Sequence, residues 1–580
     1  MTERFSKIKD PFALSLSDDG GGEPAAGRRL HGDILLRAAA AALIVTAFGL
    51  QIWLLKVYPI NLDEFEHLHA AWCLSRGVFP YRDFFEIHAP WLYFLLAPLM
   101  PPYHVGSSPD GAIAFIFFAR RIELTLTSLA LGLSFLLAWM WRGPRVAWIA
   151  TALLATTAIF AAKMLEIRPD VLALVLWLGC LCATLRAFDL VSRGAPASLW
   201  FVVSGMLLGG VMMSTQKYAL ALPGFGLAML WYLFSGRGEF RTRLSHCVLQ
   251  FAGFCAPILA TAIFMSAHGA LEPFFRLNFV KVLRLSHRIR ASHLWFRLIL
   301  GNPFLVGLGL LGLLRELLQV RPHRGFSADH FVLLNTIGLL ANSVVNNPYA
   351  QYALSFLPLL AMFAALFLIY LIELVMAQSS RRRRWSAAAI FAMALGVAAA
   401  GVLAGGALIR FGLGSALTLT LAAAVVMIPC AADVALALLL IVVGSLPIAE
   451  MTRHILLHPN PATLERLRFV IANTSPDDTV MDGWTGLGVF RTSATFYPFF
   501  NHQFVAMMPK KARLQVLADL QSGKIAPQMI FLDKYLSKVT SGIDDYVRQH
   551  YDRVEVDGSD LIWKRRGGGR DGSQRRGRPG

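Results

Sequence analysis

Long apolar runs constrain this chain more than any other feature. Between residues 37 and 449 the sequence repeatedly shows apolar stretches near the length of about 20 residues that a helix needs to cross about 30 Å of hydrocarbon. Hydrophobic residues make up 56% of the 580 positions and charged residues only 16%, so most of the chain requires lipid as its solvent. We predict a mainly α fold, a polytopic bundle of about thirteen transmembrane helices. The predicted spans are 37–57, 111–141, 147–163, 170–187, 199–214, 218–234, 247–267, 299–314, 328–345, 353–376, 386–408, 415–431 and 434–449.

The distribution of basic residues predicts how the bundle is oriented. The net charge is +18, and within the predicted membrane domain lysines and arginines gather in short loops between the spans, as is typical of cytoplasmic loops. With the N-terminus in the cytoplasm, an odd number of spans places the C-terminus outside. We therefore predict an integral protein of a bacterial inner membrane, with membrane lipids as its neighbours and no nucleic-acid partner.

Composition divides the chain into four parts. Residues 1–36 are polar and are predicted to be a disordered cytoplasmic tail, followed by a transmembrane domain over 37–450 with a long first outer loop at 58–110. Residues 451–566 are predicted to form a small soluble α/β domain outside the membrane, and the Gly/Arg-rich residues 567–580 a disordered tail.

Within the soluble domain, the patterns predict helices over 462–473 and 543–550, strands over 479–481 and 529–532, and a hairpin over 553–563. No phosphate-binding glycine loop and no nucleophile elbow occur in this domain, so we expect a lid or a recognition module. The six cysteines show no metal-type spacing, and neither a disulfide nor a zinc site is predicted.

The first outer loop begins with NLDEFEHLHAAW, in which Asp63 and Glu64 lie just past the first span. Carboxylates near lipid are costly to desolvate and are seldom placed there for packing. A solvated loop with helix-capping acids is the structural alternative. The functional interpretation is a carboxylate that orients a hydroxyl group or accepts its proton.

The same loop continues with PYRDFFEIHAPWLYF, which contains Arg82 and His88 among aromatic residues. A cation and a histidine in such a setting would suit a phosphate next to an apolar chain. The aromatic residues alone are more often part of an interfacial belt and receive no specific role.

A third motif, KMLEIRPDVLALVLW, places Arg168 and Asp170 at the start of the fourth span, on the same predicted face as Asp63. An acid in the first helical turn also favours the helix dipole, so capping is again an alternative. Lys217, in STQKYALALPGF, falls on the same face.

The outer loop over about 268–298 is basic, against the general distribution of charge. A bound anion would explain these cations, and contacts between an interfacial helix and lipid headgroups would explain them equally well. The basic residues of this loop are Arg276, Lys281, Arg284, Arg288, Arg290 and Arg297.

Acids and cations gathered on one membrane face suit the transfer of a sugar from a lipid phosphate. The departing phosphate is a weakly basic anion, which needs cations and no general acid. The attacking hydroxyl needs a carboxylate that takes its proton.

The motifs LDEFEH, FFEIHAPW and EIRPDVLAL, in this order, resemble those of the GT-C membrane glycosyltransferases, in the group of the protein mannosyltransferases and the lipid A aminoarabinose transferase. The resemblance covers roughly residues 37–450 in layout. It implies a glycosyltransferase that moves one monosaccharide from a polyprenyl-phosphate donor to a lipid, glycan or protein acceptor, with no metal or other cofactor.

The resemblance also implies roles for single residues. Asp63 matches the acid that acts on the acceptor, Asp170 matches a second outer acid, and His88 falls near the carrier phosphate, although Ala89 separates it from Pro90. The other expected substrate-binding residues are Glu64, Arg82, Arg168, Lys217, Arg284 and Arg288. A transporter or flippase, and a polymerase of lipid-linked glycans, remain alternative functions.

Overall fold

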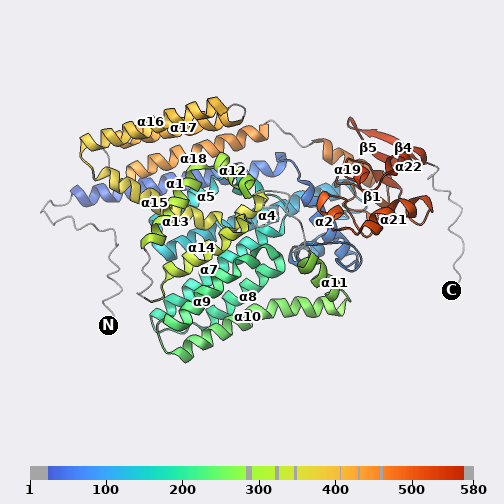
Figure 1. The fold of residues 1–580 in the computed structure, drawn as a ribbon, viewed down its shortest axis with the longest axis horizontal. Coiled ribbons are helices and arrows are strands. Elements are labelled where there is room, and N and C mark those ends of the chain that lie inside the picture. The colour runs from blue at the N-terminus through green and yellow to red at the C-terminus, as the bar shows by residue number, and fades with distance from the viewer. Residues whose placement is uncertain are drawn as a thin grey trace.

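A computed structural model shows a helical bundle with a small α/β domain packed at one end, beside α2 (Figure 1). Most of the long helices lie side by side, and the hairpin of α16 and α17 lies along one flank of the bundle. The structure describes residues 24–281, 291–319, 325–344, 349–404, 407–428, 432–456 and 461–566.

Six helices of the described residues are long and apolar enough to cross a membrane. The pair α12 and α13 is bent by 113° and would count as a seventh span if it crosses as one unit. The chain is therefore an integral membrane protein, and the predicted number of about thirteen spans stays a prediction. The six long segments are His31–Val57, Pro109–Arg142, Pro169–Ser192, Phe240–Ala267, Leu357–Met376 and Ala432–Ala449.

The helices of the bundle follow the apolar runs, with breaks that the runs alone did not reveal. The run predicted over 147–163 is divided at Thr156 and Thr157 into α5 and α6, and Pro303 begins a new helix after α12. The bounds are α1 Pro24–Val57, α4 Pro109–Arg142, α5 Pro144–Ala155, α6 Ala158–Lys163, α7 Pro169–Ser192, α8 Ser198–Ser214, α9 Leu222–Ser235, α10 Phe240–Ala267, α11 Leu271–Phe275, α12 Ala291–Gly301, α13 Pro303–Gln319, α14 Ala328–Leu340, α15 Leu357–Met376, α16 Ser380–Ala404, α17 Ala407–Met427 and α18 Ala432–Leu456.

Both predicted boundaries of the membrane domain fall inside helices. Helix α1 already begins at Pro24, within the predicted tail 1–36, because proline is well suited to a first helical turn and alanines follow it. Helix α18 continues to Leu456, past the boundary predicted at 450. Residues 1–23 and the predicted tail 567–580 lie outside the described residues.

The first outer loop, 58–110, forms α2 (Leu62–Ser75), α3 (Trp91–Leu96) and two short 3-10 turns. Phe65 and Leu68 of α2 are buried in a core that also contains Val489 and Phe490 of the C-terminal domain. The loop is thus a folded platform between the bundle and the soluble domain.

The C-terminal domain contains a five-stranded sheet in the order β2-β1-β3-β5-β4. Strands β2, β1 and β3 are parallel, whereas β5 pairs antiparallel with β3 and β4. The predicted strands, hairpin and helices of this domain are all present, and β2, α20 and α21 are additional elements. The bounds are α19 Pro461–Asn473, β1 Thr479–Asp482, β2 Thr492–Ser493, α20 His502–Met507, α21 Lys510–Gln521, β3 Met529–Phe531, α22 Ile543–His550, β4 Tyr551–Val556 and β5 Ser559–Arg565.

Arg491 fixes the domain to the outer loop. Its side chain is completely buried and donates hydrogen bonds to the carbonyl oxygens of Gly106 (2.8 Å), Ile471 and Thr474 (both 2.9 Å). Nearby, the His69 ring lies 2.9 Å from the carbonyl oxygen of Val489. These bonds join the loop to the domain.

Candidate active site

The site begins at the N-terminus of α2. Asn61 caps this helix: its side chain accepts from the backbone of Asp63, while Glu64 accepts from the backbone of Asn61 at 2.8 Å. The capping box fixes the first turn of the helix and therefore the direction of both acids. The two adjacent carboxylates have very different surroundings.

Glu64 has a structural role. Its carboxylate is completely buried and accepts from Arg120 at 2.6 and 2.9 Å and from the backbone of Ile167 at 3.2 Å. Arg120 is equally buried and also donates to the carbonyl oxygens of Tyr58 and Pro59. Because both of its oxygens are engaged inside the protein, we infer a structural role for Glu64, and its expected part in substrate binding stays a prediction.

Asp63 is the accessible carboxylate of the pair. Its side chain is 36% exposed, and one oxygen accepts from Arg168 at 2.6 Å. Burial of the carboxyl raises the pKa of Asp63, but the charge and hydrogen bond of Arg168 outweigh this effect and hold that pKa below its ordinary value of 3.8. Asp63 is therefore an anion at neutral pH.

Arg168, the residue before α7, forms a second ion pair on its other side. It is 3% exposed and pairs with the buried carboxylate of Glu166, which in turn accepts from Lys163 at 2.6 Å. Burial opposes ionisation of Glu166, but Arg168 and Lys163 lower its pKa. This row of alternating charges is rigid, so Arg168 holds Asp63 in place and is not free to move with a substrate.

Asp170 lies in the first turn of α7, two residues after Arg168. Both of its carboxylate oxygens accept from the ammonium group of Lys217, at 2.7 and 2.9 Å. Lys217 belongs to a 3-10 turn, η3 (Gln216–Leu220), between α8 and α9, and its charge lies 4.9 Å from the ring centre of Tyr352. The sequence correctly suggested that Asp170 and Lys217 share one end of the bundle.

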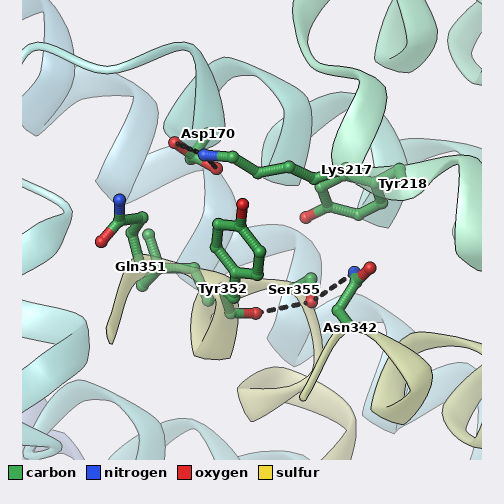
Figure 2. Close-up of a pocket in the computed structure, with 8 residues that line it drawn as sticks. Asp170, Lys217, Tyr218, Asn342, Gln351, Tyr352 and Ser355 are labelled. Atoms are coloured by element: carbon green, nitrogen blue, oxygen red, sulfur yellow. Dashed lines mark hydrogen bonds and ion pairs between the residues drawn. The ribbon is translucent and has the colours of Figure 1, made fainter. Parts of the chain in front are cut away.

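The pair Asp170–Lys217 forms one wall of a pocket (Figure 2). Tyr218 stands beside Lys217, and the opposite wall comes from described residues between α14 and α15, with Asn342, Gln351 and Tyr352. The pocket is partly open to solvent, and its interior has about 10 Å³ of free space, room for about one water-sized group.

His88 is positioned by two buried carboxylates. Its Nδ1 donates to Glu86 at 2.8 Å and lies 3.4 Å from Glu66, and these contacts leave Nε2 of the ring unused. Burial, together with the charges of Glu86 and Asp63, raises the pKa of Glu66 well above its ordinary value. The ligand atoms of Glu66, Glu86 and His88 lie within 4.8 Å of one another, so among the described residues these three could hold a metal ion.

One other predicted residue, Arg82, has its partners outside this cluster. Arg82 donates to both oxygens of Asp83 at 2.7 Å and to the carbonyl oxygen of His268 at 2.6 Å, and is itself 40% exposed. Arg284 and Arg288 lie outside the described residues.

Sequence reasoning missed the wall contributed by residues 341–344 and 349–355. Tyr349 of this segment accepts a hydrogen bond from Gln503 of α20 at 2.8 Å, and its pKa is raised by burial and by the Asp63 charge, in that order. The C-terminal domain therefore contacts the segment that faces the acids. The segment contains no charged residue, so nothing in its pattern distinguished it from an ordinary loop.

No family model matches the sequence, and no curated protein matches it either. Two solved structures of ArnT from Cupriavidus metallidurans are similar to this chain over nearly their whole length. The ArnT structure bound to undecaprenyl phosphate has a TM-score of 0.53 and 15% identity, over 91% of this chain and 97% of that one. The apo structure has a TM-score of 0.54 and 14% identity, over 93% and 98%.

The chain has the GT-C fold. The likeness extends through the bundle and the C-terminal domain, since it covers more than nine tenths of both chains. The predicted fold class, a helical membrane bundle of GT-C type with a small α/β domain, is confirmed. At 14–15% identity the likeness concerns the fold, and the chemistry has to be argued from the side chains.

Proposed function

We propose that this protein is a glycosyltransferase that moves a monosaccharide from a polyprenyl-phosphate carrier to a hydroxyl group of a lipid, glycan or protein acceptor. The observation that carries this proposal is Asp63. It is an ionised carboxylate, 36% exposed, held rigidly by Arg168 on the same helical end of the bundle as the Asp170–Lys217 pocket. An oriented, partly exposed base at the same end of the bundle as a polar pocket is what transfer to a hydroxyl requires.

Asp63 acts on the acceptor in this proposal. Its carboxylate orients the attacking hydroxyl and takes the proton as the new bond to the anomeric carbon forms. The bond from that carbon to the phosphate oxygen breaks, and the electron pair leaves with the polyprenyl phosphate. A single in-line displacement of this kind inverts the anomeric centre.

The departing phosphate needs positive charge and hydrogen-bond donors. In its imidazolium form His88 can donate from Nε2 to the phosphate, because Glu86 engages the other ring nitrogen. The arginines of the basic loop, Arg284 and Arg288, stay predicted phosphate ligands. A lipid phosphate as the leaving group is supported by the similarity in fold to ArnT, because one of the ArnT structures is bound to undecaprenyl phosphate.

We further propose that the acids face the outside of a bacterial inner membrane, with the N-terminus in the cytoplasm. A phosphatase fused after Trp563 is then expected to be active in cells, and one fused at Arg383 inactive. The reverse pattern would refute this orientation while leaving the chemistry of the site untouched.

The transfer itself is tested with purified protein in lipid vesicles. A radiolabelled polyprenyl-phosphate sugar is supplied with an extract of envelope lipids and glycans, and release of free polyprenyl phosphate is measured. We expect release that depends on the acceptor extract. Movement of the intact lipid-linked sugar across the vesicle, with no bond broken, would show a flippase, and growth of a glycan chain on the carrier would show a polymerase.

A further inference from the structure

The pocket beside Asp170 has a balanced charge. Both oxygens of Asp170 are engaged by the Lys217 ammonium group, at 2.7 and 2.9 Å, and the two side chains are only 6% and 16% exposed. Among the described residues that line the pocket, these two carry its only charges. A charged ligand would therefore meet a like charge and disturb the pair.

Two buried polar atoms in this pocket lack a hydrogen-bond partner within the described chain. The Tyr218 hydroxyl belongs to a side chain that is 2% exposed, and Oδ1 of Asn342 to one that is 1% exposed. The amide nitrogen of Asn342 is occupied, since it donates to Ser355 at 3.2 Å. Buried polar groups in proteins are nearly always bonded, so these two atoms are available to a bound water or to a ligand hydroxyl that takes its place.

The lining favours hydroxyl groups as that ligand. A phenol can donate and accept, an amide oxygen accepts, and the Gln351 side chain at the rim offers both functions (Figure 2). A sugar hydroxyl can act as donor and acceptor at once, so one edge of a sugar ring could satisfy both Tyr218 and Asn342. An ammonium group would instead meet Lys217, and a carboxylate would meet Asp170.

We propose that this pocket binds the hydroxyl-bearing edge of the transferred sugar, and that the sugar is uncharged. The proposal rests on the proposed function and specifies its substrate. It predicts a neutral hexose or pentose on the carrier, rather than an amino sugar or a uronic acid. The Asp170–Lys217 pair then serves as a fixed dipole that orients the sugar hydroxyls.

The variant Tyr218→Phe separates this role from a structural one. It removes only an unbonded buried hydroxyl, so thermal stability should stay the same or rise. If the hydroxyl binds sugar, KM for the donor should rise about three- to ten-fold. As a matched control, Tyr232→Phe removes a hydroxyl that bonds His246 at 2.9 Å, and it should lower Tm without changing the donor KM.

The choice of sugar is tested with two donors on the same polyprenyl phosphate, a neutral pentose and its 4-amino-4-deoxy analogue. The wild type should consume the neutral donor at least about ten-fold more efficiently. Equal or better use of the amino donor, or an unchanged donor KM in active Tyr218→Phe, would overturn this inference and leave the proposed function standing. Consumption of neither these donors nor any other polyprenyl-phosphate sugar would overturn the proposed function.

Discussion

Replacing Glu64 by glutamine should destabilise the protein without removing a catalytic group. The carboxylate is completely buried, and the charge of the equally buried Arg120 lies 2.6 Å away. Glutamine retains the size but leaves the guanidinium without a countercharge, and breaking a buried pair in this way costs about 3–5 kcal/mol. This is a large part of a typical free energy of unfolding of about 5–15 kcal/mol. The melting temperature in detergent should therefore fall by at least about 5 °C.

A double variant tests the cause of this loss. In Glu64→Leu/Arg120→Met both charges disappear, so the unpaired-charge penalty is absent and part of the stability should return. The recovery should be incomplete, because Arg120 also donates to the carbonyl oxygens of Tyr58 and Pro59. A Glu64→Gln protein with normal melting temperature and an increased donor KM would refute the structural role and return Glu64 to the substrate site.

Three further perturbations test other parts of the site. Gln503→Leu removes the 2.8 Å bond to Tyr349, and if the C-terminal domain positions that segment, the acceptor KM should rise several-fold with little change in melting temperature. The acid limb of the wild-type kcat profile should lie below the ordinary range of a free aspartate, since the charge of Arg168 lowers the pKa of Asp63. In Arg168→Gln the largest effect that opposes the burial of Asp63 is removed, so the acid limb of the kcat profile should move to higher pH; an unmoved limb would exclude Asp63 as its source. Arg288→Ala should weaken donor affinity about ten-fold by loss of a phosphate contact, whereas an unchanged affinity would favour the headgroup alternative.

The apolar runs predicted the class of fold because bilayer thickness imposes a length on every span. Elements of the soluble domain could also be predicted from the sequence, among them the helix at 543–550 and the hairpin turn at Asp557 and Gly558. The breaks of helices within the apolar runs could not be predicted from the sequence. Thr156 and Thr157 end α5 inside an apolar stretch, and hydropathy alone contains no signal for such a break.

The candidate site was predictable where charge is rare and therefore conspicuous. Asp63, Arg168, Asp170 and Lys217 stood out against an apolar background, and the structure gathers them at one end of the bundle. The different surroundings of Asp63 and Glu64 could not be predicted from the sequence. They depend on Arg120, which lies 56 positions from Glu64 along the chain.

The uncharged wall of the pocket could not be predicted from the sequence either. Asn342 and Tyr352 are ordinary loop residues by type, and only the packing of their segment against α7 and η3 gives them a role. The charge pattern of the sequence therefore indicates which end of the bundle holds the candidate site. The uncharged residues that line a pocket can be identified only from tertiary contacts.

The central claim is that Asp63 takes the acceptor's proton during transfer from a polyprenyl phosphate. The most direct test is single-turnover release of polyprenyl phosphate by Asp63→Asn, with the exposed Asp545→Asn as a matched control. A general base contributes about 10²- to 10⁴-fold, so Asp63→Asn should lose rate by that factor while it still binds the donor and remains folded. Near-normal release by Asp63→Asn would contradict the account, and Asp63 would then be only a helix-end partner of Arg168.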